Sequence, residues 1–165
     1  MKEIQLSQNK ISLIDDEDFI VISKFNWYAH RWLQRNGKYG DFYAHANVTL
    51  PDGTKTTIAM HRLIMNANKG IKIDHRNNNT LDNRKHNLRL ATNYQNQQNR
   101  SKQFGTSRFK GVTWHKVCGK WEAQIQTNKN KIHLGTFLNE KDAATAYNEA
   151  ANKYFGEFAH LNIIE

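Results

Sequence analysis

Apolar and polar residues alternate over two neighbouring stretches in the last third of the chain. Trp121, Ala123 and Ile125 share one face of the first stretch, and the alternation resumes from Ile132 onward. Successive side chains of a strand point to opposite faces of a sheet, so this period of two predicts two strands with apolar inner faces. The polar residues 128–130 between them indicate a turn.

A helical spacing follows these strands. Asn139 is a suitable N-cap, and Glu140 and Asp142 place acidic charge in the first turn of the expected helix. The apolar positions that recur at helical spacing are Ala143, Tyr147, Ala150, Ala151 and Tyr154. We therefore expect a three-stranded antiparallel sheet packed on one helix over residues 108–165.

The first part of the chain is rich in aromatic and β-branched residues, which favour strands. Strands are expected near residues 27–29 and 42–44, and a Pro-Asp-Gly turn at 51–53 leads into a return strand over 55–60. Residues 60–65 have the pattern of a short helix. Antiparallel strands are thus predicted at the N-terminal end, and the chain falls in the α+β class.

Composition changes twice along the chain. Residues 67–100 are dominated by Asn, Asp, Arg and His, and residues 101–107 have the composition of a linker. We expect one domain over 1–100, a linker over 101–107 and a second domain over 108–165. Each domain is large enough for a small core only.

The chain carries a strong excess of positive charge. Its 165 residues include 24 Lys and Arg against 15 Asp and Glu, which gives a net charge of +9. This balance favours a polyanionic partner, and nucleic acid is the first candidate because neutralised phosphates release condensed counterions. A protein that is merely basic is the alternative that charge alone leaves open.

Cysteine content limits the kinds of metal site that the chain can form, and hydropathy indicates where the protein is located. The single cysteine, Cys118, excludes an internal disulfide and a Cys-rich zinc site, so a bound metal must use oxygen and nitrogen ligands. No apolar run approaches the roughly 18 residues of a membrane helix, and the N-terminal residues lack the apolar stretch of a signal peptide. We therefore expect no membrane association and a cytoplasmic location.

A constellation of polar side chains occupies the centre of the chain. A short strand is expected to end in Asp74 and His75, and an Asn-rich loop and a second short strand follow it. Thr92 can then cap a helix that carries Asn96. Strand, loop, strand and helix of these lengths can direct several polar side chains at one point.

These residue types suit the hydrolysis of a phosphodiester bond. A neutral imidazole such as that of His75 is a suitable base for activating water near neutral pH. A hard cation such as Mg²⁺ prefers oxygen ligands, which the Asp74 carboxylate and the Asn96 amide can supply. Phosphate and water would complete its coordination, and the metal would offset charge on the departing oxygen.

Residues 71–99 resemble the His-Asn-His (HNH) nuclease family, the ββα-metal group. The resemblance is carried by Asp74 and His75, residues 80–84, Asn87 and Asn96. In the family pattern His75 matches the general base and Asn87 the middle Asn, which holds the loop and the base in place. Asn96 matches the third position, where this chain has Asn in place of His.

Further similarity extends the resemblance to free-standing homing endonucleases of the phage type. It lies at residues 13–19, 27–29 and 60–64, so that the resemblance covers nearly residues 10–100. The resemblance implies a site-selective endonuclease that cuts double-stranded DNA with Mg²⁺, with Mn²⁺ able to substitute. We expect a monomer with one active site. The alternative is a catalytically inactive DNA-binding transcriptional regulator on a nuclease-derived scaffold.

Residues 108–162 resemble the plant APETALA/ethylene-response-factor DNA-binding domain. The matching segments are 109–112, 119–125, 134–137, 143–147, 150–151 and 161–162. In that family the outer face of the sheet lies in the major groove of DNA. The positions carried over as DNA contacts are Lys110, Thr113, His115, Lys120, Gln124, Gln126, Lys131 and His133.

Different roles are expected for these contacts. The lysines, with Lys129, are expected on phosphates, whereas Gln124 and Gln126 could bond adenine edges or be ordinary exposed strand residues. Arg31 and Arg35 in the N-terminal part are expected to follow the DNA backbone.

Several other polar and aromatic residues have a plainer interpretation. Asn77, Asn78, Asn79, Asp82 and Asn83 are expected to be mainly turn formers. His61 is expected to be a structural histidine, and Trp114 and Trp121 are expected to lie in the core.

Overall fold

The computed structural model describes residues 1–165 except 36, 103, 104 and 129, and the expected linker over 101–107 therefore lies partly outside the described residues. The chain divides into two compact units, Met1–Ala91 and Thr92–Glu165. This division falls ahead of the expected linker, because the helix after Ala91 groups with the C-terminal unit. The domain boundaries at 100 and 108 stay a prediction.

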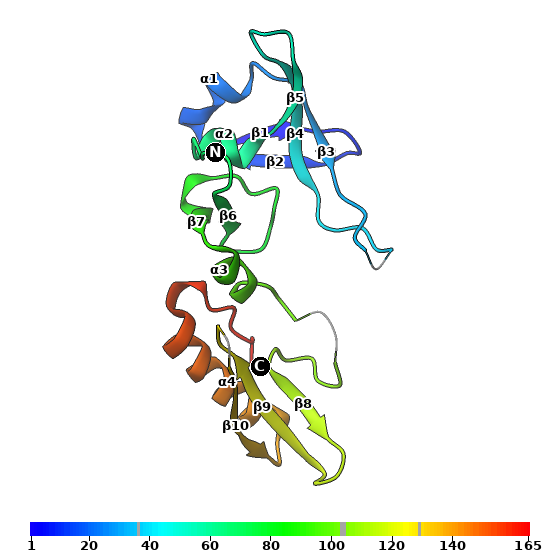
Figure 1. Ribbon diagram of the computed structural model, residues 1–165, viewed down its shortest axis with the longest axis vertical. Coiled ribbons are helices and arrows are strands. Elements are labelled where there is room, and N and C mark those ends of the chain that lie inside the picture. The colour runs from blue at the N-terminus through cyan, green and yellow to red at the C-terminus, as the bar shows by residue number, and fades with distance from the viewer. Residues whose placement is uncertain (36, 103–104, 129) are drawn as a thin grey trace. The chain divides into compact units, whose positions relative to one another are not determined.

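Strands and short helices alternate in the N-terminal unit (Figure 1). A hairpin of β1 (Lys2–Gln5) and β2 (Ile11–Ile14) precedes the 3-10 turn η1 (Asp16–Asp18) and helix α1 (Phe19–Ile22). An antiparallel sheet follows in the order β3 (Trp27–His30), β4 (Tyr43–Thr49) and β5 (Lys55–Ala59). Helix α2 (Met60–Ile64) then leads to a second hairpin, β6 (Lys72–His75) and β7 (Leu88–Ala91), with η2 (Lys85–Asn87) in its loop.

One apolar cluster holds the N-terminal unit together. Ile14, Ile22 and Met60 are fully buried within it, and Trp27 is a further buried member. Each comes from a different element, so burial of this cluster fixes the first hairpin, α1, the sheet and α2 to one another. The strands and the short helix expected for residues 27–65 are confirmed. The hairpin of β1 and β2 was not expected.

The loop between β6 and β7 is attached to the first hairpin by backbone hydrogen bonds. The Leu13 amide donates to the Leu81 carbonyl at 2.9 Å, and the Asn83 amide donates to the Leu13 carbonyl at 2.8 Å. Strand β2 thereby pairs locally in parallel with residues far along the chain. This contact holds a long polar loop that has no regular structure over most of its length.

A three-stranded antiparallel sheet packed on one helix forms the centre of the C-terminal unit. The sheet has the order β10 (Lys131–Phe137), β9 (Lys120–Gln126) and β8 (Val112–His115), and α4 (Glu140–Phe155) lies along one face (Figure 1). Ala123 and Ile125 meet Ala143 and Tyr147 of the helix in the core. Asn139 caps α4 by accepting a hydrogen bond from the Lys141 amide. The expected α+β fold is confirmed.

Close approach of the helix requires a glycine at position 111. Gly111 has a φ of +75°, and a Cβ built there would lie 2.0 Å from Cδ2 of Tyr147 and 2.7 Å from the Gln124 carbonyl oxygen. Only glycine accepts both that backbone conformation and that proximity.

Helix α3 (Asn93–Gln98) completes the C-terminal unit, together with the 3-10 turn η3 (Gly156–Phe158). Thr92 and Gln95 form a capping box at its start, as expected for the cap at Thr92. The Tyr94 ring packs edge-on against Phe155 of α4 with ring centroids 6.3 Å apart. At its end, the ammonium of Lys110 donates to the carbonyls of Gln98 and Arg100. These contacts attach α3 to the sheet-and-helix module.

Candidate active site

The hairpin of β6 and β7 positions the Asp-His pair. Its register places Asp74 opposite Arg89 and His75 opposite Leu88. Asp74 and His75 are adjacent in a strand and therefore point to opposite faces, yet both are buried, at 4% and 5% exposure. Buried polar side chains need partners, and each of the two has one in the described structure.

Asp74 is paired with Arg89 across the two strands. The Arg89 Nε lies 2.7 Å and its Nη2 lies 2.6 Å from the same oxygen, Oδ2 of Asp74. Arg89 is itself only 6% exposed, so the carboxylate and the guanidinium offset each other's charge in a site that excludes water. Nothing in the sequence pattern of β7 had indicated this role for Arg89.

His75 contacts a buried amide through its Nε2. This nitrogen lies 3.2 Å from Oδ1 of Asn83. Burial lowers the pKa of His75 below its usual value, whereas its hydrogen bond to the Asn83 side-chain oxygen and the nearby carboxylates of Asp74 and Asp82 act in the opposite direction. The net shift is downward, so the imidazole is neutral at physiological pH, which is the form that can accept a proton.

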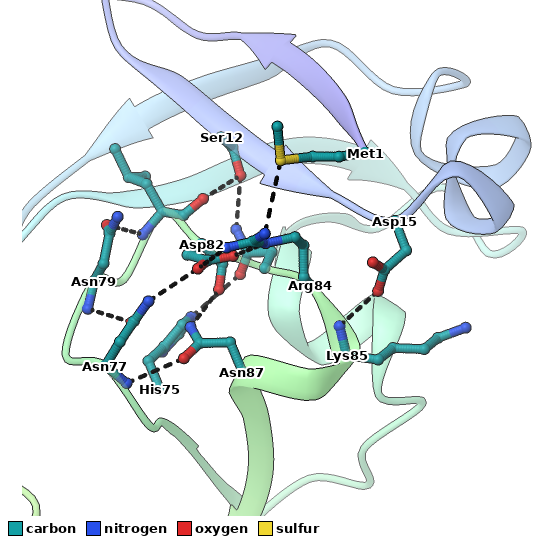
Figure 2. A network of polar contacts seen from close by, with 12 residues as sticks. Met1, Ser12, Asp15, His75, Asn77, Asn79, Asp82, Arg84, Lys85 and Asn87 are labelled. Carbon is teal, nitrogen blue, oxygen red and sulfur yellow. Dashed lines mark hydrogen bonds and ion pairs between the residues drawn. The ribbon is translucent and has the colours of Figure 1, made fainter.

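The loop that follows His75 is organised by side-chain amides and one ion pair (Figure 2). The Asn87 amide group donates to the Asp82 carbonyl at 2.8 Å, and its oxygen accepts from the Asn77 backbone amide at 3.0 Å. Asp82 in turn accepts two hydrogen bonds from Arg84, each at 2.7 Å. Asn87 therefore bridges the two ends of the loop.

Two aromatic side chains lie against the His75 ring. The ring centroid of His61 is 5.4 Å away and that of Tyr43 is 6.2 Å away, both in edge-on arrangements. Burial lowers the pKa of His61 to about 3, and the positive charge that protonated His75 carries acts in the same direction, so His61 is also neutral at physiological pH. His61 thus lies next to the candidate base. The sequence placed it at a strand-helix junction and gave no sign of this contact.

The donor set for a metal consists of oxygen atoms. In the part of the chain that the structure describes, no three His, Cys, Asp or Glu side chains gather into a metal-binding group. Arg89 engages Oδ2 of Asp74. The Asp74 carboxylate supplies an oxygen donor of the kind that a hard cation such as Mg²⁺ prefers. Asn96 lies on α3 in the C-terminal unit, and its role as a ligand stays a prediction.

The expected DNA contacts of the C-terminal unit occupy its sheet. Lys120, Gln126, Lys131 and His133 are exposed, whereas Thr113, His115 and Gln124 are half-buried. His133 is paired with Glu122, with Nδ1 and Oε1 3.0 Å apart. The expected contact Lys129 lies outside the described residues.

Lys110 differs from the other expected DNA contacts, because its ammonium already donates to two carbonyls. Those hydrogen bonds reach the Gln98 carbonyl at 2.5 Å and the Arg100 carbonyl at 2.7 Å. Burial lowers the pKa of Lys110 to about 8. A contact from Lys110 to phosphate remains an expectation from family resemblance.

The two expected arginine contacts of the N-terminal unit are both exposed. The Arg31 guanidinium stacks over the rings of Tyr39 and Phe42 at 4.4 and 4.7 Å. Stacking of this kind holds the guanidinium near the protein surface.

Two of the plainer interpretations are wrong. Asn83 is not simply a turn former, because it is fully buried and bonded to His75. Trp114 is 38% exposed and is not a core residue, although its ring packs edge-on against half-buried Trp121 at 5.0 Å. A buried amide in an irregular loop leaves no periodic signal, so only the folded structure identifies Asn83.

Comparison with known proteins decides the family. A family model described as HNH endonuclease matches residues 59–98. An uncharacterized HNH endonuclease of Acanthamoeba polyphaga mimivirus is 32% identical over 146 residues, which span 88% of this chain and 71% of the viral protein. The chain belongs to the HNH endonuclease family. This is the family that its central motif had indicated.

A second similarity links the HNH endonuclease to plant DNA-binding proteins. A 60-residue segment is 47% identical to APETALA2-like protein 2 of Oryza sativa subsp. indica and spans 35% of this chain but 14% of that protein. The Dehydration-responsive element-binding protein 2D of Arabidopsis thaliana is 45% identical over 59 residues, 34% of this chain and 28% of that protein. Both expected resemblances are confirmed, and the chain spans a small part of these plant relatives.

Over the described residues of the HNH endonuclease, no helix combines the length and the apolar character needed to cross a bilayer.

Proposed function

We propose that this HNH endonuclease is a metal-dependent, site-selective enzyme that hydrolyses phosphodiester bonds of double-stranded DNA. The observation that carries the proposal is the geometry of His75, which is buried and held through Nε2 at the end of a strand, next to Asp74. Burial also lowers the pKa of His75, which favours the neutral ring. A base for water activation needs a neutral ring in a fixed orientation. The match of residues 59–98 to the HNH family supports the same assignment.

In the proposed reaction, His75 takes a proton from the water that attacks the scissile phosphorus. Asn87 acts as a positioning residue, since its two hydrogen bonds hold the loop that carries the contacts of His75. Depression of the His75 pKa by burial keeps the ring in its basic form at neutral pH.

Asp74 and Asn96 are the proposed ligands of a divalent metal, Mg²⁺ with Mn²⁺ able to substitute. The oxygen character of both side chains supports this choice. When bound, the metal supplies charge to offset that of the phosphate and the departing oxygen. The ion pair with Arg89 holds the Asp74 carboxylate in a single orientation.

Residues 1–100 are proposed to form the nuclease domain. Residues 108–165 are proposed to form a C-terminal module that selects the DNA site. Similarity of a 60-residue segment to plant DNA-binding proteins supports this assignment. The proposed contacts are the family positions Lys110, Thr113, His115, Lys120, Gln124, Gln126, Lys131 and His133. Arg31 and Arg35 are proposed to contact the DNA backbone.

The proposed enzyme acts as a monomer of the homing-endonuclease type in the cytoplasm of a phage-infected or bacterial cell. One active site per chain then nicks one strand in each visit. The net charge of +9 favours association with DNA at low ionic strength.

Incubation of the purified chain with supercoiled plasmid and phage genomic DNA tests the proposal. The expected result is nicking in Mg²⁺ and in Mn²⁺ and none in excess chelator. Tight binding to DNA that contains the bound site, with no cleavage in either metal, would contradict the proposal. That outcome would favour the catalytically inactive regulator.

A further inference from the structure

A single carboxylate lies among the basic and amide side chains of the C-terminal sheet. Glu122 is the one acidic residue of strands β8, β9 and β10, all of whose residues the structure describes. Its neighbour Ala123 is in the core, and successive strand residues alternate between faces, so Glu122 lies on the outer face with Lys120 and Gln124. This is the face proposed to contact DNA. A carboxylate there repels phosphate, so it weakens binding unless it accepts a hydrogen bond from the DNA.

His133 of the neighbouring strand holds the carboxylate of Glu122. Its Nδ1 lies 3.0 Å from Oε1 of Glu122. The contact lies beside a bulge, because His133 is opposite Gln124 whereas Gly135 is opposite Ala123. A carboxylate only accepts hydrogen bonds, so the ring nitrogen donates to it. One carboxylate oxygen is thereby engaged, and within the described residues no hydrogen bond reaches the other, Oε2.

The surroundings of Glu122 leave it accessible from the solvent side of the sheet. Thr113 lies opposite it on β8 and Thr136 lies opposite it on β10. Both side chains are short, and the Glu122 side chain is 25% exposed. Lys120, two residues earlier on the same face, is exposed and can bond phosphates beside an approaching base. The edge of a base can therefore reach the carboxylate.

In the major groove, a carboxylate matches one base better than the other three. Cytosine presents a donor, its N4 amino group, whereas guanine presents the acceptors N7 and O6, and thymine presents the acceptor O4 and a methyl group. Adenine presents both the N6 donor and the N7 acceptor. Because a carboxylate only accepts, it is repelled by guanine and thymine and satisfies only part of the adenine edge. Cytosine is the base that it bonds without conflict.

We propose that Glu122 recognises a cytosine in the DNA site by accepting a hydrogen bond from its N4 amino group in the major groove. His133 is the positioning residue, since its hydrogen bond orients the carboxylate and leaves one oxygen for the base. The inference rests on the proposed role of the C-terminal module as the selector of the DNA site. Glu122 is outside the positions that the plant family resemblance supplies, and the inference adds the base that it recognises.

Selection of bound sequences from a random pool of duplex DNA tests the proposal. The full-length chain is used in excess chelator, so that metal-dependent cleavage does not remove bound molecules. The expected wild-type site contains a required cytosine, and replacing that base pair should weaken binding at least about fivefold, the lower end of what one base contact discriminates.

Three variants identify the position that Glu122 recognises. Glu122→Gln keeps the shape of the side chain but offers a donor and an acceptor, the combination that matches adenine. Its selected site should change from cytosine to adenine at one position and keep the others. Glu149→Gln is the matched control, because Glu149 is exposed on α4, which covers the opposite face of the sheet, and its loss removes the same charge. His133→Leu should weaken the cytosine preference at the same position without a change to adenine.

Two results would overturn the proposal. Unchanged base preferences in Glu122→Gln, with tighter binding to every sequence, would show that the carboxylate only repels phosphate. Wild-type sites without a required cytosine on either strand would be equally decisive. Unchanged preferences in His133→Leu would remove the positioning role of His133.

Failure of the inference and failure of the proposed function give different results, because binding in chelator does not depend on cleavage. A chain that selects a site and cuts it in neither metal would remove the proposed nuclease activity and leave recognition by Glu122. A wild type with no sequence preference would remove the proposed site selection, and the inference with it. An unchanged site in Glu122→Gln, in an enzyme that still cuts that site, would remove only the role of Glu122.

Discussion

Replacement of Arg89 by Met should strongly destabilise the N-terminal unit. The guanidinium and the Asp74 carboxylate are 6% and 4% exposed, and two guanidinium nitrogens lie 2.7 and 2.6 Å from Oδ2 of Asp74. At a charge separation of about 4 Å and an effective dielectric constant of about 20, the attraction is about 4 kcal/mol. Removing one partner of a buried pair costs about 3–5 kcal/mol, because the other charge stays in a dry site. The estimated attraction thus lies within the range expected for the loss of stability on removing one partner.

Urea unfolding followed by hydrogen exchange measures this effect, since exchange separates amides of β6 and β7 from those of the C-terminal unit. The expected fall in the urea midpoint exceeds about 1 M. Lys85→Met is the control: Lys85 is 44% exposed and pairs with exposed Glu17 and half-buried Asp18, so a loss of no more than about 1 kcal/mol is expected. A decrease for Arg89→Met no larger than that control would refute the reasoning. The double variant Asp74→Leu with Arg89→Met should recover much of the stability.

Two other changes test separate parts of the structure. Gly111→Ala should destabilise the C-terminal unit by about 2–5 kcal/mol in urea unfolding, because the backbone strain at φ +75° adds to the clash of the new Cβ with Tyr147, 2.0 Å away. Gly119→Ala is the control: its φ is +60° but its Cβ would meet open space, so it should lose only the stability that backbone strain costs. Arg84 holds the pKa of Asp82 below its ordinary 3.8, so the stability that this carboxylate contributes is present above pH 3.8 and is lost as pH falls through its lower folded value. Asp82→Asn should therefore flatten the dependence of the urea midpoint on pH below 3.8, and an unchanged acid slope would contradict this.

Regular elements of this protein follow from its sequence because they repeat. The alternation around Ala123 and Ile125 and the helical spacing from Ala143 to Tyr154 predict the C-terminal sheet and helix, which the structure has. The capping residues Thr92 and Asn139 likewise mark the helix starts that are observed. Period and cap chemistry are local properties, so the chain reveals them without its fold.

The parts that sequence could not reveal depend on contacts between distant segments. Asn83 lies among other loop asparagines, and its burial arises only when β2 pairs with the loop. Arg89 in β7 is a partner of Asp74 because of strand register. The grouping of α3 with the C-terminal unit depends on the packing of Tyr94 against Phe155. None of these contacts has a periodic signature.

The central claim is that His75 activates the attacking water and contributes little to DNA affinity. Side-by-side measurement of nicking rate in Mg²⁺ and of DNA affinity in chelator, for wild type and His75→Ala, tests it most directly. The account predicts that nicking falls by about 10²- to 10⁴-fold while affinity stays near that of wild type. An equal loss of cleavage and affinity, or cleavage that persists in His75→Ala, would contradict it.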